Sequence, residues 1–268
     1  MTGAAQSPLL EVRGLGKRFA RRGVRAESLW AIRELSFAVA EREFLTIVGP
    51  SGSGKSTLLN LLAQIDAPTE GEIRFRGRAI ASPTSGALRP GWERQFGYVT
   101  QDDTLLPWRT LADNVLFPLR VQGRLDRHAR ERATELMQAV GLAGFEGHYP
   151  HELSGGMRKR AALIRTLVYD PPVILMDEPF GALDAQTRTQ LQADLLRLWS
   201  GGGKTIVFVT HDIAEAIALG DRTLVFTRAP ARVQGEHRIA IPRPRDVLNL
   251  YGLEGFPELY ERIRKELA

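Results

Sequence analysis

The sequence contains no cysteine and no long run of apolar residues. Without thiols the chain cannot form disulfides, cysteine-ligated zinc sites, iron–sulfur clusters or a thiol nucleophile. No stretch approaches the roughly 18 consecutive apolar residues that a membrane-spanning helix needs. The first residues, MTGAAQSPLLEVRG, also lack the basic and apolar segments of a secretory signal. We therefore expect a protein of the cytoplasm.

The composition is that of an ordinary globular protein, and it leaves the type of partner open. Hydrophobic residues make up 43% and charged residues 25% of the 268 positions, and the formal net charge is +5. A basic balance suits a phosphate-rich ligand, a nucleic acid or the anionic face of a membrane. It equally suits arginine-rich surfaces that face only water, so charge alone does not choose a function.

The order of sequence patterns predicts an α/β fold. Apolar runs typical of buried strands, such as FLTIV at Phe44–Val48, alternate with helical patterns, which indicates a largely parallel sheet covered on both faces. Between about residues 110 and 141 the apolar spacing becomes helical and strands are missing, which predicts a helical insertion. A short charged helix is expected over Phe256–Leu267, near the end of the chain.

A glycine-rich stretch directly after the FLTIV strand has the pattern of a phosphate-binding loop. The sequence GPSGSGKST matches G-x-x-x-x-G-K-[ST] and is followed by a helical segment. Backbone N–H groups of such a loop converge on phosphate oxygens, the lysine lies beside the β- and γ-phosphates, and the next hydroxyl can bind Mg²⁺. A simple glycine-rich turn would not explain the lysine. The predicted nucleotide-binding residues are Gly49, Pro50, Ser51, Gly52, Ser53, Gly54, Lys55, Ser56 and Thr57.

A second apolar strand, in the sequence VILMDE, ends in two acids. The carboxyl ends of parallel strands are where α/β sheets bind ligands. We expect Asp177 to hold Mg²⁺ through water and Glu178 to act as the general base for an attacking water. Such a pair on its own can be a solvated strand end, but the phosphate loop favours the catalytic interpretation.

The turn LSGGM, residues 153–157, offers a second place for an anion. Ser154 can cap the following helix, and the N–H groups of Gly155 and Gly156 are uncovered at that helix's N-terminus. With the phosphate loop before it and the DE pair after it, the sequence resembles the ATP-binding subunit of an ABC transporter from about residue 9 to residue 241. LSGGM is similar to that family's LSGGQ signature, from which Met157 departs.

The resemblance implies an architecture and an assembly. The fold would be a RecA-like P-loop NTPase core with an antiparallel β subdomain and an inserted helical subdomain at roughly 105–160. Residues 1–241 would form one ATPase domain, and 242–268 a C-terminal extension with a short helix. Two subunits, identical or closely related, would pack head to tail so that each ATP lies between one phosphate loop and the partner's signature residues Ser154, Gly155 and Gly156.

Three further residues acquire roles only through the resemblance. Gln101, after FGYVT, resembles the Q-loop glutamine, which approaches Mg²⁺ and the water. Asp184, in the stretch GALD that begins at Gly181 and includes Ala182, resembles the D-loop, which crosses to the other subunit. His211, after TIVFVT, resembles the switch histidine that hydrogen-bonds the γ-phosphate. ATP and Mg²⁺ are the implied substrate and metal.

The aromatic residue that stacks on adenine is less clearly marked. Phe19 occupies the position of the family's stacking aromatic, which is usually a tyrosine. Trp30 competes with it because the segment from Ala20 to Leu29 is longer than the family pattern leads us to expect. We favour Phe19, and the other residue would then be a core residue.

Several stretches resemble the nitrate, sulfonate and taurine importer branch, among them LLPWRTLADNV, PFGALDAQTR, THDIAEA and IPRPRD. The branch implies transmembrane permease subunits as partners, an extracytoplasmic solute-binding protein acting indirectly, a peripheral location on the cytoplasmic face of the membrane, and no nucleic acid. In LLPW, residues Leu105, Leu106 and Trp108 would help to line an apolar groove for the permease; core packing is the alternative.

Three other functions share parts of this pattern. A soluble ABC-type ATPase acting on nucleic acid or ribosomes would suit the positive charge, but the repair type needs a long coiled coil and the translation type two cassettes, and neither is present. An exporter or lipid transporter would have the same core motifs. A P-loop kinase would need an acceptor pocket and would have no use for LSGG.

Overall fold

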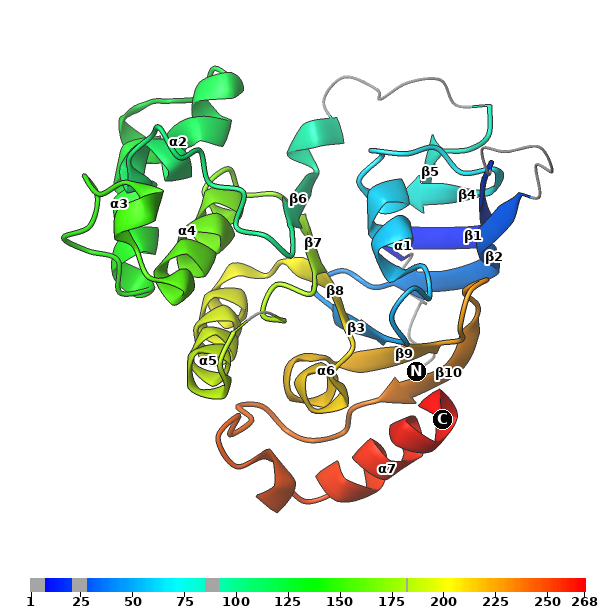
Figure 1. Cartoon of the computed structure of the whole chain (residues 1–268). Helices are drawn as coiled ribbons and strands as arrows, with labels where there is room; N and C mark the ends of the chain where they lie inside the picture. The colour runs from blue at the N-terminus through cyan, green and yellow to red at the C-terminus, as the bar shows by residue number, and fades with distance from the viewer. Residues whose placement is uncertain (1–7, 21–27, 85–91, 182) are drawn as a thin grey trace, which may run out of the picture. The chain divides into compact units, whose positions relative to one another are not determined.

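The computed structural model describes residues 8–20, 28–84, 92–181 and 183–268 (Figure 1). These residues fall into two compact units. The first unit comprises the described residues of Met1–Trp92 and Thr205–Ala268, and the second unit those of Glu93–Lys204. Each unit is described by itself below.

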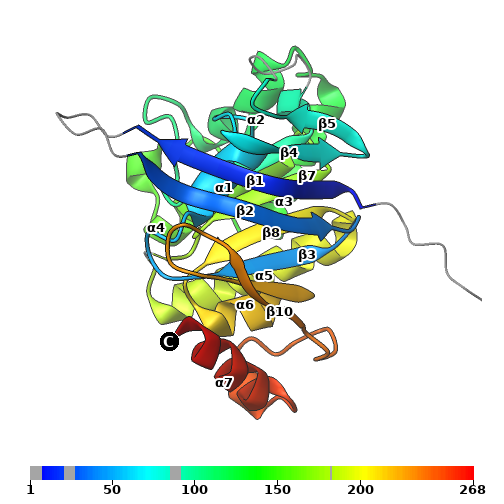
Figure 2. The same ribbon diagram turned by 90° about the vertical axis from the view of Figure 1, so that its right-hand side faces the viewer.

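The first unit contains an antiparallel sheet of four strands in the order β2-β1-β4-β5 (Figure 2). Its strands alternate buried and exposed residues over much of their length, as expected for a sheet with one covered face. The sheet confirms the predicted antiparallel β subdomain. The bounds are β1 (Leu10–Phe19), β2 (Leu29–Val39), β4 (Glu70–Phe75) and β5 (Arg78–Ala81).

Four more strands of the first unit lie in the order β10-β9-β3-β8. Strand β3 runs parallel to both β8 and β9, whereas β10 is antiparallel to β9. Every residue of β3 and β8 is buried, as the continuous apolar runs predict. The bounds are β3 (Phe44–Val48), β8 (Thr205–Thr210), β9 (Arg222–Phe226) and β10 (Val233–Arg238).

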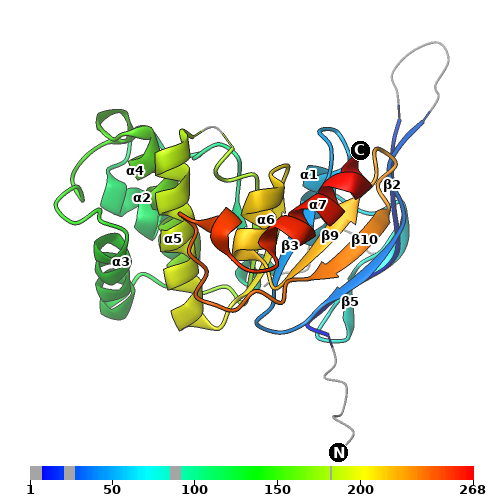
Figure 3. The ribbon, with the colours of Figure 1, turned by 90° about the horizontal axis from the view of Figure 1, so that it is seen from below.

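Three helices accompany these strands. Helix α1 (Lys55–Leu62) follows β3, and α6 (Ile213–Leu219) follows β8. Helix α7 (Phe256–Leu267), after the short 3-10 helix η3 (Leu250–Gly252), has the predicted bounds. Figure 3 shows α7, in red, running beside α6, and apolar residues of the two helices share one buried cluster. The C-terminal helix is therefore part of the first unit's core.

The boundary of the second unit falls within the short 3-10 helix η1 (Trp92–Arg94), whose last two residues belong to this unit. Strand β6 (Phe96–Val99) follows. β6 pairs in parallel with β7 (Val173–Asp177). Helices α2 (Leu111–Val121), α3 (Arg127–Ala139) and α4 (Gly155–Leu167) follow β6, with η2 (Pro150–Glu152) before α4. Helix α5 (Ala185–Gly202) follows β7.

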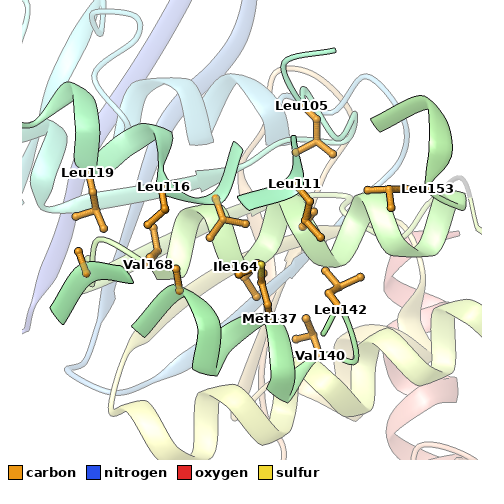
Figure 4. Close-up of a cluster of buried hydrophobic side chains, with 14 residues drawn as sticks. Leu105, Leu111, Leu116, Leu119, Met137, Val140, Leu142, Leu153, Ile164 and Val168 are labelled. Atoms are coloured by element: carbon orange, nitrogen blue, oxygen red, sulfur yellow. The ribbon is translucent and has the colours of Figure 1, made fainter. Parts of the chain in front are cut away.

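Helices α2, α3 and α4 enclose their own hydrophobic cluster (Figure 4). The helical spacing of Ala133, Leu136, Met137 and Val140 in the sequence predicts one apolar stripe. Ala133, Met137 and Val140 are buried in the cluster, and Leu136 packs against it. Gly141, at φ 70°, ends the stripe in the left-handed conformation that glycine adopts without strain. The helical insertion and the α/β fold class are confirmed. The domain limits at residues 105–160 and at residue 241 stay predictions.

Candidate nucleotide-binding site

The predicted phosphate loop joins strand β3 to helix α1 in the first unit. Val48, the last residue of β3, pairs with Thr210 at the end of β8 and with Val225 of β9. Residues 49–54 form the turn, and Lys55, Ser56 and Thr57 open the helix. The loop therefore leaves the carboxyl edge of the parallel strands, where α/β sheets bind ligands.

Two glycines of the loop have conformations that other residues rarely adopt. Gly52 has φ 75° and Gly54 φ 98°. A β-carbon at Gly54 would lie 2.7 Å from the carbonyl oxygen of Ala31, closer than two such atoms can approach. Ser53, between them, is buried, and its Oγ has no hydrogen-bond partner in the described part of the chain. A buried hydroxyl without a partner is suited to a phosphate oxygen.

Lys55 is almost completely buried, yet it is a cation. Its Nζ donates to the carbonyl oxygens of Gly49, at 2.8 Å, and Pro50, at 3.0 Å. The ammonium group is thus held against the inside of the loop. At this point a positive charge and the N-terminus of α1 favour the same anionic ligand.

His211 lies at the same edge of the first unit. Because Val48 pairs with Thr210, the phosphate loop and His211 both follow directly after adjacent parallel strands. The side chain of His211 is exposed. Asp212 caps the next helix, since its Oδ1 accepts the backbone N–H of Glu215 at 3.1 Å. Register alone therefore places the predicted switch histidine beside the predicted phosphate loop.

The two candidates for stacking on adenine differ in exposure. Phe19, at the end of β1, is 43% exposed, with Nζ of Lys17 5.0 Å from its ring centroid. Trp30 is half-buried, with the guanidinium groups of Arg18 and Arg33 at 5.5 and 5.8 Å from its ring. The more open ring is that of Phe19. Residues 21–27 of the long connecting segment lie outside the described residues.

In the second unit, the predicted general base and the Q-loop glutamine come together. Val99 of β6 pairs with Met176 of β7, so Gln101 and Glu178 follow the same edge of these two strands. A β-carbon built at Gly181 would be 3.8 Å from Oε2 of Glu178 and 3.9 Å from Nε2 of Gln101. A carboxylate and an amide thus both lie beside Gly181, a pair of groups suited to accepting a proton from a water and orienting it.

Asp177, next to the predicted base, interacts with a tyrosine that the sequence did not single out. Tyr98 of β6 hydrogen-bonds to the Asp177 carboxylate. Burial raises the pKa of Tyr98, and the charge and hydrogen bond of Asp177 raise it further. The tyrosine therefore stays a neutral donor that orients Asp177. On sequence alone it was one aromatic residue of a strand, with no signal for this contact.

The LSGG turn caps helix α4. Oγ of Ser154 accepts the backbone N–H of Met157 at 3.3 Å. A β-carbon at Gly155 would meet Nη2 of Arg158 at 4.0 Å, an ordinary contact, whereas a β-carbon at Gly156 would lie only 2.8 Å from the methyl group of Thr187. Met157 packs against the helical cluster.

Asp184 caps α5 in the same way, with its Oδ1 accepting the N–H of Thr187 at 2.9 Å. Hydrogen bonds from the backbone lower the pKa of Asp184. Ala182 of the predicted D-loop lies outside the described residues. The capped ends of α4 and α5 line one cleft of about 450 Å³. The residues that line it are Ser154, Gly155, Gly156, Met157, Arg160, Leu183, Asp184, Gln186, Thr187 and Gln190.

Basic residues of α4 hold the segment that carries Gln101. Lys159 donates to the carbonyl oxygen of Gln101, and Arg165 donates to the carbonyl oxygens of Asp103, at 3.1 Å, and Thr104, at 2.8 Å. Burial lowers the pKa of both cations. The sequence did not mark them, because lysine and arginine on a helix usually face water. The only sign of this role in the sequence is that Lys159 and Arg165 both follow LSGG in the same helical segment.

The described residues lack two kinds of feature, a cluster of metal-binding side chains and a membrane-spanning helix. Across residues 8–20, 28–84, 92–181 and 183–268, no group of three or more His, Asp or Glu side chains could hold a metal ion. In the same ranges no helix is long and apolar enough to cross a membrane.

Comparison with known proteins identifies the family of the chain. The family model described as "ABC transporter" matches residues 32–181. A taurine import ATP-binding protein of Rhizobium johnstonii is 42% identical, covering 87% of each chain. An aliphatic sulfonates import ATP-binding protein of Bacillus cereus is 35% identical over 96% of this chain and 95% of its own.

A solved structure agrees as well. A dimeric ATP-binding cassette in a post-hydrolysis state, bound to ADP and phosphate, has a TM-score of 0.73 and 33% identity, covering 86% of this chain and 98% of its own. The sequence match, the shared fold and the phosphate loop point to one conclusion. The chain belongs to the ABC transporter family, and it is an ATP-binding subunit that hydrolyses ATP.

Proposed function

We propose that this chain energises the import of a small sulfonate, with taurine as the representative solute. The support is the import function printed for its taurine and aliphatic-sulfonate relatives, at 35–42% identity over most of the chain. The structural observation that carries the catalytic part is the convergence of Glu178 and Gln101 beside Gly181. The chain itself would hydrolyse ATP and would not touch the solute.

The site residues divide into binding and hydrolysis. The loop of residues 49–57 binds the phosphates through backbone N–H groups, and Lys55 neutralises charge on the β- and γ-phosphates. Phe19 stacks on adenine. Glu178 takes the proton of the attacking water, while Gln101 orients that water and His211 donates to a γ-phosphate oxygen.

Mg²⁺ fits the donors that the sequence supplies. The hydroxyl of Ser56, the amide oxygen of Gln101 and the carboxylate of Asp177 are the hard oxygen ligands that Mg²⁺ prefers. When bound, Mg²⁺ would neutralise charge developing on the phosphates. Tyr98 would keep Asp177 oriented for it.

The chain would act as a dimer beneath two permease subunits, at the cytoplasmic face of the membrane. The relative bound to ADP and phosphate is dimeric. In a dimer, the signature residues Ser154, Gly155 and Gly156 of one copy would bind the γ-phosphate held by the other, with Asp184 crossing between them. A solute-binding protein would deliver the solute to the permease and would not contact this chain.

Uptake of labelled taurine in the native organism tests the transport function. Deleting the gene for this chain should abolish taurine uptake and leave sulfate uptake unchanged. The wild-type gene should restore taurine uptake, and a Glu178→Gln variant should not. Normal taurine and alkanesulfonate uptake in the deletion strain would refute sulfonate import.

Purification of the tagged Glu178→Gln variant with ATP present tests the partners. We expect a multi-span permease to co-purify from detergent-solubilised membranes. Recovery of nucleic acid or ribosomes alone would instead support the soluble ATPase alternative. Phosphate release by the pure wild-type chain without any acceptor distinguishes it from a kinase.

A further inference from the structure

Helix α6 begins two residues after His211 and has only seven residues. A helix this short is not stable alone, so its position depends on what packs against it. Asp212 connects it to β8: its backbone N–H donates to Oγ1 of Thr210 at 3.0 Å, and its side chain caps α6. The backbone at His211 therefore lies between a strand fixed in a sheet and a helix that must be held in place.

Arg245 holds the C-terminal end of α6. It is 6% exposed, and its Nη1 donates to the carbonyl oxygens of Ile217 at 2.7 Å, Ala218 at 3.2 Å and Gly220 at 2.5 Å. Its Nε donates to the carbonyl oxygen of Ile241 at 3.0 Å. A buried arginine usually pairs with a carboxylate, but the hydrogen bonds of this one go to backbone carbonyls.

The charge of Arg245 survives its burial. Burial lowers the pKa of Arg245 to about 10, with a contribution from nearby Arg243, so the group is still a cation at neutral pH. A cation at a helix C-terminus is favoured by the helix dipole. Arg243 adds to this cap, because it donates to the carbonyl oxygen of Leu219 and binds Asp221 at 2.9 Å. The IPRPRD stretch is thus a helix cap.

Helix α7 covers the rest of α6. Phe256, Leu259 and Ile263 lie on one side of α7 and are buried in a cluster that includes Ile213 and Ile217 of α6. Figures 1 and 3 both show the two helices beside each other. The apolar face of α7, which the sequence left without a role, is therefore a support for α6.

An aromatic group joins α7 to the short helix η3 that precedes it. The ring of Tyr251 lies 5.0 Å from that of Phe256 and 5.9 Å from that of Tyr260. Burial raises the pKa of Tyr260, and the neighbouring Tyr251 and Asp212 raise it further. The charge of Asp212 thus acts on Tyr260.

We propose that the segment 242–268 positions His211 for ATP hydrolysis, by holding α6 through Arg245 at one end and through helix α7 along its side. The inference rests on the proposed role of His211. A displacement of reacting groups by about 1 Å can cost about 10²-fold in rate. The C-terminal segment is then a part of the catalytic apparatus, with Arg245 as a positioning residue and not a catalytic one.

The first test separates turnover from nucleotide binding. In Arg245→Met we expect kcat for ATP hydrolysis to fall about tenfold or more. The affinity for ATP should stay unchanged, since the phosphate loop does not contact Arg245. Arg245→Lys keeps a cation with fewer donors and should recover part of kcat; it carries the test if Arg245→Met does not fold. Arg262→Met, an exposed arginine of α7, loses the same charge and should hydrolyse normally.

A double-mutant cycle separates positioning from general loss of structure. His211→Ala alone should lower kcat strongly. Adding Arg245→Met to it should then have less than about a twofold effect, because the residue being positioned is gone. An equal loss of kcat in both backgrounds, or wild-type kcat in Arg245→Met, would overturn the inference. Absence of hydrolysis by the wild-type chain would refute the proposed function instead.

Discussion

Glu178 has an unusual backbone as well as a reactive side chain. Its φ of 43° lies in the left-handed region that non-glycine residues seldom adopt. Such strain persists only where the surrounding structure enforces it, and it is frequent at active sites. Here it accompanies a carboxylate that, like the amide of Gln101, lies beside Gly181. The strained backbone and this placement support the same role, that of a base held in one orientation.

The Glu178→Gln variant should bind ATP but scarcely hydrolyse it. Glutamine keeps the size and polarity of the side chain and removes its ability to accept a proton, so kcat should fall about 10²–10⁴-fold. Phosphate release and nucleotide affinity, measured on the same preparation, provide the test. Glu135→Gln, on the exposed side of α3, is the control. A normal rate in Glu178→Gln would exclude the general-base assignment.

Residues that belong to a chemical motif could be proposed from the sequence, whereas the residues that contact them in the fold could not. The phosphate loop, Glu178 and the LSGG turn were identifiable because their chemistry depends on residue type and order. Tyr98 and Arg245 were not, because a tyrosine in a strand and an arginine in a basic stretch are common. Only tertiary packing brings these two to Asp177 and to the end of α6.

Among the secondary-structure elements, those with a continuous pattern were predicted closely. The run FLTIV coincides with β3, and α7 has the predicted bounds. The apolar pattern at Leu9–Val12 predicts only a short strand, but β1 continues to Phe19, because its exposed second half is stabilised by pairing with β2. Backbone hydrogen bonds between strands do not require apolar side chains, so the apolar pattern in the sequence is shorter than strand β1.

Packing between α4 and α5 constrains the signature turn. Gly156 is in close contact with Thr187, the residue whose N–H is capped by Asp184. Arg160 of α4 also binds the buried carboxylate of Asp194 of α5 at 3.1 Å. The two helix N-termini that line the cleft are thus fixed to each other within the second unit.

Adjacent glycines of the signature should respond differently to alanine. Gly156→Ala should destabilise the protein by about 1–3 kcal/mol, because the new methyl group collides with Thr187. Gly155→Ala meets only the end of the Arg158 side chain, at 4.0 Å, in the first turn of α4 and should be neutral or stabilise by up to about 1 kcal/mol. Urea unfolding of the two variants tests this. Equal stabilities would contradict the close packing of α4 on α5.

On the scale of the whole molecule, a contact with a partner would involve the LLPW stretch, in which the side chain of Trp108 is exposed. Trp108 is 71% exposed, whereas Leu105 is buried in the helical cluster and so belongs to the core. Buried Asn114 fixes the turn by accepting from the N–H of Leu106, at 2.7 Å, and donating to the carbonyl oxygen of Arg109, at 3.0 Å. The turn is thus ordered around an exposed tryptophan.

Trp108→Ala should uncouple transport from hydrolysis if this turn contacts the permease. A buried tryptophan at an interface often contributes about 2 kcal/mol or more to binding, so uptake should fall more than about tenfold. ATP hydrolysis by the isolated chain should not change. Phe145→Ala, another exposed aromatic of the second unit, is the control. A loss of ATP binding in Trp108→Ala would mean that the residue supports the fold and not a partner.

The resemblance to a dimeric family assigns the phosphate loop and the signature to different copies at each ATP. Mixing two inactive variants tests this arrangement. Lys55→Ala loses the phosphate loop's cation. Gly155→Glu places a negative charge at the start of α4, where the new β-carbon would approach Nη2 of Arg158 only to 4.0 Å and the helix dipole favours a carboxylate, but where the carboxylate repels phosphate. Each variant alone should be inactive.

An equal mixture of the two variants should regain activity. In a mixed dimer, the intact phosphate loop of Gly155→Glu meets the intact signature of Lys55→Ala, so one of two sites works. Random pairing makes half of the dimers mixed, so activity should reach about a quarter of the wild-type value if the sites act independently. A mixture as inactive as its components would contradict a site shared between copies. Because neither variant can complete a site alone, recovery would show that the catalytic unit is the dimer.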